Sequence, residues 1–461
     1  MSLRLSIPNY RQKEIRWIAN FIFNEMLGIE IDIEVSNENV FILSDGDKSI
    51  HIANIFFSKT LTNWLALESL PTQPLKVWQP INFPNFPNFL INSELPIIFG
   101  DSSFSSSENS IAVGLDIFGS AFFMLSRYEE LVIAERDQYD RFPAAASLAQ
   151  KENFLSRPIV DEYVEILRQC IKKLFPKTIL QNKKGKVLVT CDVDAPYDPA
   201  LKNYLFLLKE IKIDIFKHRN FKVAAKRFIN FFASGFGNYT FDPNNTFDWY
   251  MEVCEKNGHT AAFYFIPDNT AGKIDGCYNL NEKYIENLIK KITSRGHEIG
   301  MHASFNTYDN PEQLKKERQI LSDTCRALGI AQKIMGNRQH FLRFNLQQTP
   351  NHLEQAGFEY DTTGGFADAI GFRFGTSHTF SMWNWITNEG MKLKQKPLIL
   401  MEVTVFNYMK LDCNVATLQK LKNLKINALR FGGDFTLLWH NDKFFTPQDK
   451  AFFESLISSS V

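Results

Sequence analysis

Two patterns of apolar positions divide the chain into two parts. Near the start, apolar residues recur at helical spacing over 10–28 and then alternate with acidic residues over 29–35. This predicts a helix followed by a half-buried strand. Asp45 and Gly46 lie between two short apolar runs and indicate a hairpin turn. Helices mixed with short strands predict an α+β domain, and we place it over residues 1–180.

In residues 181–461, short apolar runs alternate with amphipathic stretches. Such an alternation is typical of a parallel sheet whose faces are covered by helices. Six or seven strand–helix units predict a distorted (β/α) barrel of about seven strands, so the fold class is α/β with a preceding α+β domain. The clearest predicted strands are 186–191, 260–266, 298–301, 398–405 and 435–439, and the clearest helices are 246–257, 281–294, 311–328 and 349–356.

An insertion over 201–240 interrupts this alternation. Between residues 202 and 227 it holds eight Lys or Arg and two acidic residues, with many Phe and Leu between them. One interpretation is a basic helical lid that contacts an anionic or lipid-linked substrate, or a membrane surface. The other is an ordinary packed insertion with a solvated basic face.

Composition and charge exclude several classes of protein. The chain has 51 basic and 51 acidic residues, and a net charge of zero argues against a general nucleic-acid binder. No run of about 18 apolar residues predicts a transmembrane helix, and charged residues interrupt the start of the chain before a signal peptide could form. The six cysteines are scattered and contain no Cys-x-x-Cys pair. We expect reduced thiols in a cytoplasmic protein.

The ends of two predicted strands carry groups that could bind a metal ion. Asp192 and Asp194 follow one strand and His302 ends another. In an α/β barrel these ends meet at one rim. Two adjacent carboxylates repel each other unless a cation intervenes, so one Asp could be a ligand and the other a base. Asn306 would lie beside His302 if this stretch were helical, giving Asp194, His302 and Asn306 as ligands. The alternative is an Asp-rich turn with a hydrogen-bonded interior histidine.

Other polar residues in the second part could complete an active site at this rim. His440 follows the predicted strand 435–439, where it could act as a general acid. Arg338 could hold a carboxylate with two hydrogen bonds, and Asp361 could orient His440. Glu402 is a charge within an apolar strand and needs a partner. For Arg338, Asp361 and Glu402, a structural ion pair is the alternative to a catalytic role.

These residues resemble the motifs of the polysaccharide deacetylase family, the metal-dependent carbohydrate esterases. The resemblance extends from about residue 186 to 455, and its most specific part is the segment from Gly296 to His302. Residues 1–180 do not take part in it and look like an N-terminal extension of unknown role. The matching segments are Thr190–Asp194, Gly296–His302 and Leu437–His440, with Arg338 and Asp361 as single residues.

The resemblance implies a role for each matching residue. Asp192 would be the catalytic base, oriented by Arg338, and His440 would protonate the leaving amine with support from Asp361. Asp194 and His302 would bind the metal, with zinc as the first choice and cobalt or nickel as alternatives. Asn306 departs from the family, which has a second histidine there, and Val193 separates two carboxylates that are usually adjacent. We assign His340 and Trp439 to substrate binding.

The function we expect is removal of N-acetyl groups from a sugar of a bacterial glycan or glycan precursor, including a lipid-linked one, by a metal-dependent hydrolase. Two alternatives remain. A barrel that kept its glycan groove but lost catalysis would be a binding protein, with Asn306 as the trace of that loss. A metal-free glycoside hydrolase would use a carboxylate pair such as Asp192 and Glu402.

Overall fold

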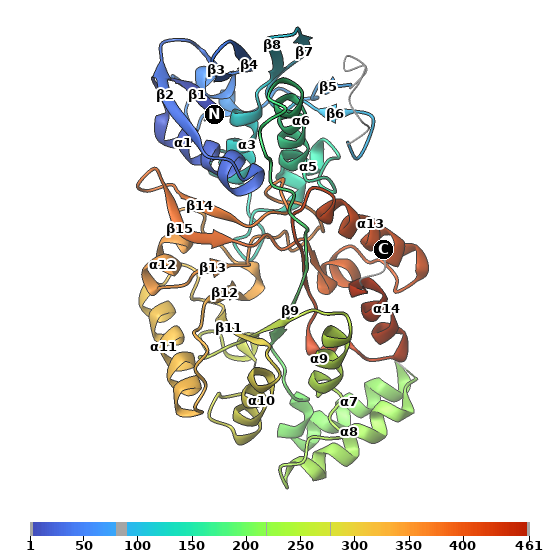
Figure 1. Cartoon of the computed structure of the whole chain (residues 1–461). Coiled ribbons are helices and arrows are strands. Elements are labelled where there is room, and N and C mark those ends of the chain that lie inside the picture. The colour runs from blue at the N-terminus through green and yellow to red at the C-terminus, as the bar shows by residue number, and fades with distance from the viewer. Residues whose placement is uncertain (1–2, 80–89, 218, 277, 459–461) are drawn as a thin grey trace.

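A computed structural model describes residues 3–79, 90–217, 219–276 and 278–458 of the chain. Figure 1 shows two sheets with their helices, the N-terminal one at the top and the C-terminal one below. The structure is therefore mixed α/β. Within these residues, no helix combines the length and the apolar content that crossing a bilayer requires.

The N-terminal sheet has six strands in the order β2-β1-β3-β4-β8-β7. Its β3 and β4 pair antiparallel across Asp45, as the sequence predicts, whereas β1 and β2 pair in parallel. A separate two-stranded sheet is formed by β5 (Val77–Trp78) and β6 (Leu95–Pro96). The six strands are β1 (Leu3–Pro8), β2 (Ile31–Ser36), β3 (Val40–Asp45), β4 (Lys48–Ala53), β7 (Gly100–Ser106) and β8 (Ser110–Leu115).

The helices of this part include one that is buried on all sides. Every residue of α3 is buried, as expected of a helix that is apolar around its whole circumference. The helix predicted over 10–28 is an α-helix, α1, that continues as a π-helix, η1, up to Gly28 in the left-handed conformation. The helices are α1 (Gln12–Asn20), η1 (Phe21–Leu27), α2 (Phe56–Lys59), α3 (Ile117–Leu125), α4 (Tyr128–Val132), α5 (Leu148–Lys151) and α6 (Ile159–Leu174).

The C-terminal sheet has nine strands in the order β14-β15-β13-β12-β11-β10-β9-β17-β16 and forms a half-barrel. All pairs are parallel except β14 with β15. The sheet has more than the seven or so strands expected, because it includes the two-residue strands β13 and β16 and an antiparallel edge strand, β14. The strands are β9 (Val187–Val193), β10 (Ala261–Phe265), β11 (Glu298–Ala303), β12 (Gly336–Gln339), β13 (Tyr360–Asp361), β14 (Phe380–Asn384), β15 (Glu389–Gln395), β16 (Leu400–Met401) and β17 (Phe435–Leu438).

Helices between these strands bury their apolar sides in one core with the sheet. The strands β9, β10 and β17 are buried over most of their length, which is typical of a parallel sheet covered on both faces. The insertion after β9 is a helical hairpin of α7 (Tyr204–Phe216) and α8 (Phe221–Ser234). The other helices are α9 (Phe247–Lys256), α10 (Lys283–Ser294), α11 (Pro311–Ala327), α12 (Thr349–Ala356), α13 (Val415–Leu429) and α14 (Pro447–Ile457).

Buried ion pairs join the two parts. The Glu130 carboxylate accepts two hydrogen bonds from Arg373, at 2.9 and 2.7 Å, and a third from Arg127 at 2.7 Å. These three side chains are almost completely buried. Asp161 in α6 accepts hydrogen bonds from Thr376 and Ser377 of the C-terminal part. The N-terminal part is therefore fixed against the half-barrel through charged groups that have no access to water.

We predict that Arg373→Ala lowers the free energy of unfolding by about 3 kcal/mol, because it removes two of the three charged hydrogen bonds to the buried Glu130. The matched control is Lys13→Ala. It breaks an exposed ion pair with Glu389 that also joins the two parts, and it should cost less than about 1 kcal/mol. Urea titration followed by circular dichroism measures both effects. Equal transition midpoints for the two variants would contradict the prediction.

Candidate metal centre

The parallel register of the half-barrel brings the predicted site residues to one edge. Asp192 of β9 pairs with Tyr264 of β10, and Tyr264 pairs with Gly300 of β11. Two residues further along, Asp194 and His302 are therefore level with each other at the carboxyl ends of their strands. Gly300 is required within this arrangement, because a Cβ atom there would lie 2.4 Å from the Tyr264 ring.

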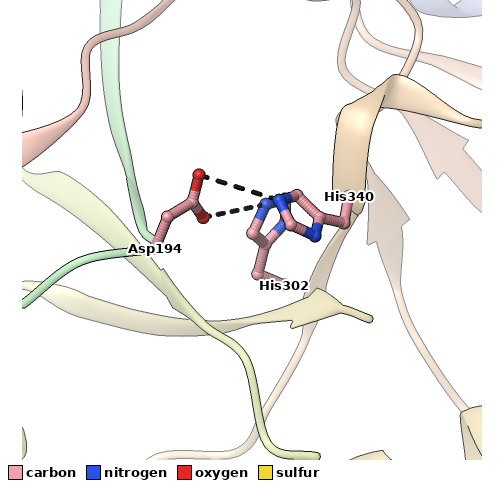
Figure 2. Close-up of side chains that lie close together, drawn as sticks. All are labelled: Asp194, His302 and His340. Atoms are coloured by element: carbon pink, nitrogen blue, oxygen red, sulfur yellow. Dashed lines mark ion pairs between the residues drawn. The ribbon is translucent and has the colours of Figure 1, made fainter. Parts of the chain in front are cut away.

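Three side chains at this edge form a group with the spacing of a metal site. Asp194, His302 and His340 each offer one ligand atom, and these atoms lie within 4.8 Å of one another. The Asp194 carboxylate is 3.4 Å from His302 Nε2 and 3.8 Å from His340 Nε2. Figure 2 shows the carboxylate facing both imidazoles. One carboxylate and two imidazoles are a donor set that suits zinc.

Hydrogen bonds on the far side of each imidazole fix its orientation. His302 Nδ1 donates to the Arg338 carbonyl at 2.9 Å, which leaves Nε2 without a proton in the neutral ring. Burial lowers the pKa of His302, so the neutral form is favoured. His340 Nδ1 lies 2.9 Å from the buried Asp275 carboxylate. Both rings therefore direct Nε2 toward Asp194, in the manner of histidine ligands held by a second hydrogen bond.

The charge of Asp194 also suits a bound cation. Burial by itself would raise its pKa, but the imidazoles of His340, His302 and His440 lower the pKa to about 2. The carboxylate is therefore ionised at neutral pH. Its Oδ1 atom is buried and has no hydrogen-bond donor among the described residues. A buried anionic oxygen without a donor is unfavourable unless a cation contacts it, so the residues present fit a divalent metal ion.

Asp192 lies beside this group and is held by Arg338. The guanidinium donates to Asp192 Oδ1 at 2.8 Å and to the Thr190 hydroxyl at 2.9 Å, and it is completely buried. The other oxygen of Asp192 is 3.5 Å from His302 Nε2. One oxygen of Asp192 is thus fixed by Arg338, whereas the other faces the group of possible ligands.

His440 contacts the group through the Oδ2 atom of Asp194, whereas His302 lies at Oδ1. His440 Nε2 is 3.5 Å from Asp194 Oδ2, and its Nδ1 is 2.5 Å from Glu402 Oε1. Burial would lower the pKa of His440, but the buried Glu402 carboxylate outweighs it and raises the pKa to about 10. His440 is therefore a protonated imidazole at neutral pH, with Nε2–H directed toward the site.

These side chains open into a cavity of about 200 Å³. Its volume is below that of pockets that enclose drug-sized ligands, so it admits one ring or substituent at a time. A larger cavity of about 1220 Å³ lies elsewhere, near Arg157 and Lys420, and none of the residues above line it. Besides the carboxylates and imidazoles described above, the smaller cavity is lined by Arg141, Phe341, Leu342, Met401, Val403, Tyr408 and Lys443.

Arg141 brings the N-terminal part into the wall of this cavity. Its guanidinium donates to the Phe341 carbonyl at 2.9 Å and to the Tyr408 hydroxyl at 3.2 Å. Phe341 and Leu342 both have a left-handed backbone, with φ of 60° and 56°, which is unfavourable for residues with a Cβ atom. Arg141 therefore supports the unusual turn that directly follows His340.

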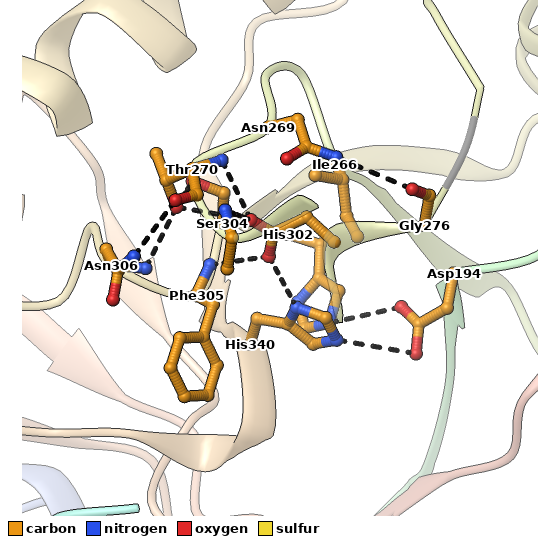
Figure 3. A network of polar contacts seen from close by, with 12 residues as sticks. Asp194, Ile266, Asn269, Thr270, Gly276, His302, Ser304, Phe305, Asn306 and His340 are labelled. Carbon is orange, nitrogen blue, oxygen red and sulfur yellow. Dashed lines mark hydrogen bonds and ion pairs between the residues drawn. The ribbon is translucent and has the colours of Figure 1, made fainter. Parts of the chain in front are cut away.

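Asn306 lies outside the group, which corrects the ligand set expected from the sequence. The chain after β11 forms a turn, so Asn306 does not project beside His302. Its amide donates to the Thr270 carbonyl at 3.0 Å and its side chain is exposed. Figure 3 shows Asn306 directed toward Thr270, while His340 faces Asp194. His340, which we assigned to substrate binding, takes the third position.

Two further expectations need correction. Asp361 does not contact His440; its carboxylate accepts from Asn337 and Thr363, and Glu402 holds His440 instead. The Asp361 side chain supports the ends of β12 and β13. Trp439 is buried in the core, where its ring stacks on Phe444, and it does not line the cavity. A strand alternates its side chains between two faces, so Trp439 and His440 point to opposite sides.

The sequence held a signal for both residues whose roles we missed. Glu402 is a charge within the apolar run 398–405, and that charge requires a buried partner, which is His440. The strand predicted over this run is shorter in the structure, and Glu402 directly follows β16. His340 follows β12, the strand adjacent to β11, and the carboxyl ends of parallel neighbours meet at one edge. Asp275, which orients His340, ends the short 3-10 helix η6 (Gly272–Asp275) between β10 and α10, and its position could not be inferred from strand periodicity.

Two family models match separate parts of the chain. Residues 238–360 match the family model for polysaccharide deacetylase, and residues 3–176 match a family of unknown function, DUF7033. The chain therefore carries a polysaccharide deacetylase domain, which confirms the resemblance that its motifs indicated. This match includes His302, Arg338 and His340, whereas Asp192, Asp194 and His440 lie outside its bounds. No curated protein matches the chain.

Several solved structures show weak similarity over 60% of this chain and 84% of their own. One is a Mycobacterium smegmatis protein assigned to the polysaccharide deacetylases, with 17% identity and a TM-score of 0.39. Another is a Pseudomonas aeruginosa PAO1 protein with the same assignment, at 12% identity and a TM-score of 0.37. A third is Puue allantoinase, at 12% identity and a TM-score of 0.38.

We predict that His340→Ala weakens zinc binding by at least about 100-fold, because a site with three protein ligands loses one of them. The control is Asn306→Ala, which should leave the affinity unchanged because Asn306 faces Thr270. Competition titration against a chromophoric chelator measures both affinities. The opposite ranking, with Asn306→Ala losing the metal and His340→Ala keeping it, would contradict the ligand set.

Proposed function

We propose that this protein is a metal-dependent hydrolase that removes N-acetyl groups from a sugar of a glycan or glycan precursor. The family match supports a carbohydrate deacetylase, and the single observation that carries the proposal is the group of Asp194, His302 and His340 with Asp192 and His440 beside it. Deacetylation needs a base for the attacking water and an acid for the leaving nitrogen, and Asp192 and His440 both lie beside this group, 3.5 Å from His302 and from Asp194 respectively.

The donor set fits a divalent ion, with zinc as the first choice and cobalt or nickel as alternatives. When bound, such an ion lowers the pKa of water and polarises an acyl carbonyl. Asp194, His302 and His340 would hold it. The role of the remaining residues is to move protons and to orient the amide.

Asp192 is placed to accept a proton from the attacking water. Its Oδ1 atom is held by Arg338, so the free oxygen has a defined direction toward the group. Attack of the water oxygen on the acyl carbon breaks the carbon–nitrogen bond once the nitrogen is protonated. His440 is placed to donate that proton from Nε2, because Glu402 holds Nδ1 and keeps the ring charged. The products are acetate and a free amine on the sugar.

The alternatives receive less support. The non-catalytic binding protein was suggested by Asn306, but His340 supplies the second imidazole that Asn306 lacks. The glycoside hydrolase requires Asp192 and Glu402 as a carboxylate pair facing the substrate. Glu402 is almost completely buried, is bonded to His440 and does not line the cavity.

We predict that the zinc-loaded protein releases acetate from N-acetylated oligosaccharides and that Asp192→Asn lowers kcat by about 10² to 10⁴, because the base is lost. The variant should retain zinc, since Asp192 is not one of the three proposed ligands. Acetate is measured with a coupled enzymatic assay, and bound metal is measured by mass spectrometry.

Chelation provides the control for this experiment. Removal of the metal should abolish acetate release, and returning zinc should restore it. A metal-loaded protein that releases no acetate from any N-acetylated glycan offered would exclude the proposed function. Release of sugar that persists after chelation would support the glycoside hydrolase instead.

We predict that Glu402→Gln moves the alkaline limb of the kcat/KM profile to lower pH by at least about one unit. The protonated form of His440 is the active acid, so activity falls as the pH rises through its pKa. The Glu402 carboxylate raises that pKa, and its removal must lower it. Glu402→Asp is the matched control and should keep most of the limb in place. A uniform loss of activity with an unchanged limb would show that Glu402 only stabilises the fold.

A further inference from the structure

The hairpin of α7 and α8 has a polar interior. It is inserted between β9 and α9, and the two helices pack on each other and on η5 (Pro199–Lys202). Arg227 of α8 is buried, and its guanidinium contacts Asp214 of α7 at 2.6 Å and also Asp198. Asn230 donates to Asp242 at 2.7 Å. Several polar side chains of the hairpin therefore lie in its interior.

The outer surface of the hairpin is apolar to a degree found nowhere else in the described residues. Of the 23 large hydrophobic side chains that are exposed there, eleven fall between residues 204 and 241. A monomeric soluble protein rarely gathers exposed apolar side chains in this way without a function. They are Tyr204, Leu205, Phe206, Leu208, Phe216, Phe221, Phe228, Ile229, Phe232, Phe236 and Phe241.

In each helix, helical geometry places several of these side chains on the side away from the buried polar residues. In α8, Phe221, Phe228 and Phe232 are seven and four residues apart, so they line a single stripe. The buried Arg227 and Asn230 occupy the opposite side of the same helix. In α7, the exposed Leu205, Leu208 and Phe216 likewise lie away from the buried Leu207 and Asp214. Both helices thus present apolar residues outward.

Positive charges surround this apolar surface. Six basic residues of the hairpin are exposed, whereas Glu210 is half-buried and Asp214 is paired inside. Lys222 and Lys226 flank the phenylalanine stripe of α8, one turn apart. The sequence allowed a packed insertion with a solvated basic face, but the exposed face carries phenyl rings together with cations. The exposed cations are Lys209, Lys212, Lys217, Arg219, Lys222 and Lys226.

We propose that this hairpin docks on an anionic membrane surface. Phe and Leu side chains on the outer face would enter the boundary between headgroups and acyl chains, and the lysines would contact anionic headgroups, as in amphipathic helices that lie in the interface. The helices have 13 and 14 residues, too few to span a bilayer. The positive charge selects an anionic lipid surface over a neutral apolar partner. This inference goes beyond the proposed function and does not depend on it.

The hairpin is attached close to the metal centre. Asp198, at its base, is four residues beyond Asp194, and its backbone N–H donates to Asp242 at 3.0 Å. Asn244 and Asn441 both donate to the Ala195 carbonyl, which joins this base to the strand end that carries the site. Docking would therefore hold the cavity near the membrane surface. In Figure 1 the hairpin lies at the end of the molecule opposite the N-terminal sheet, so the latter would face away from the membrane.

The test is co-sedimentation of the full chain with vesicles of phosphatidylcholine, with and without phosphatidylglycerol. Binding is expected only when phosphatidylglycerol is present, and added salt should weaken it. Phe228→Ser with Phe232→Ser should weaken binding at least about tenfold, because two rings no longer enter the interface. Lys222→Gln with Lys226→Gln should weaken it about fivefold per lysine.

Matched controls remove similar side chains elsewhere. Ile386→Ser with Phe445→Ser removes two exposed apolar groups, and Lys290→Gln with Lys315→Gln removes two exposed lysines on α10 and α11. Both should bind vesicles as the unaltered chain does. Circular dichroism confirms that each variant is folded, and the lysine variants test the idea even if the phenylalanine variant unfolds.

Three outcomes would overturn the proposal. The first is absence of vesicle binding, and the second is equal binding of neutral and anionic vesicles. The third is self-association of the chain through this face, seen by light scattering as an oligomer that the phenylalanine variant abolishes while vesicles remain unbound.

Discussion

The parallel register of β9, β10, β11 and β12 is the constraint on which the site depends. Because these strands run in one direction, their carboxyl ends meet at one edge, and residues far apart in the sequence arrive at the same level. Asp194 and His302 face each other for this reason. The buried Arg338 then joins β12 to Asp192 of β9 and fixes the carboxylate that lies next to them. Without this register the charged groups would have no shared cavity.

Charge balance within the cavity follows from that arrangement. Three imidazoles surround the Asp194 carboxylate, and their combined effect keeps it ionised in spite of its partial burial. Asp275 and Glu402 in turn contact the outer nitrogens of His340 and His440. Each of the three imidazoles thus has a hydrogen-bond partner at Nδ1, the nitrogen that faces away from Asp194. That partner determines which nitrogen carries the proton in the neutral ring. His440 is charged because of the Glu402 carboxylate, whereas burial favours the neutral form of His302, which carries its one proton on Nδ1.

Strand periodicity in the sequence was enough to bring Asp192, Asp194, His302 and His440 together, because each lies in or just beyond a predicted strand, whereas Arg338 was expected from the family resemblance. It failed at Asn306, where a turn rather than a helix follows the strand. It also failed to choose between Asp361, at the end of β13, and Glu402, directly after β16, as the partner of His440, because only the three-dimensional spacing decides. The N-terminal part was expected to be α+β, but its contact through Arg141 depends on a loop that no periodicity describes.

The buried ion pairs at the junction of the two parts have a consequence for how such a protein can change over evolutionary time. Glu130, Arg127 and Arg373 are charged and excluded from water, so each is tolerable only while the others remain. Joining this half-barrel to an unrelated N-terminal segment would leave Arg373 with an unmatched charge in an apolar junction. We therefore expect the two segments to be inherited together, with substitutions on one side of the junction accompanied by changes on the other.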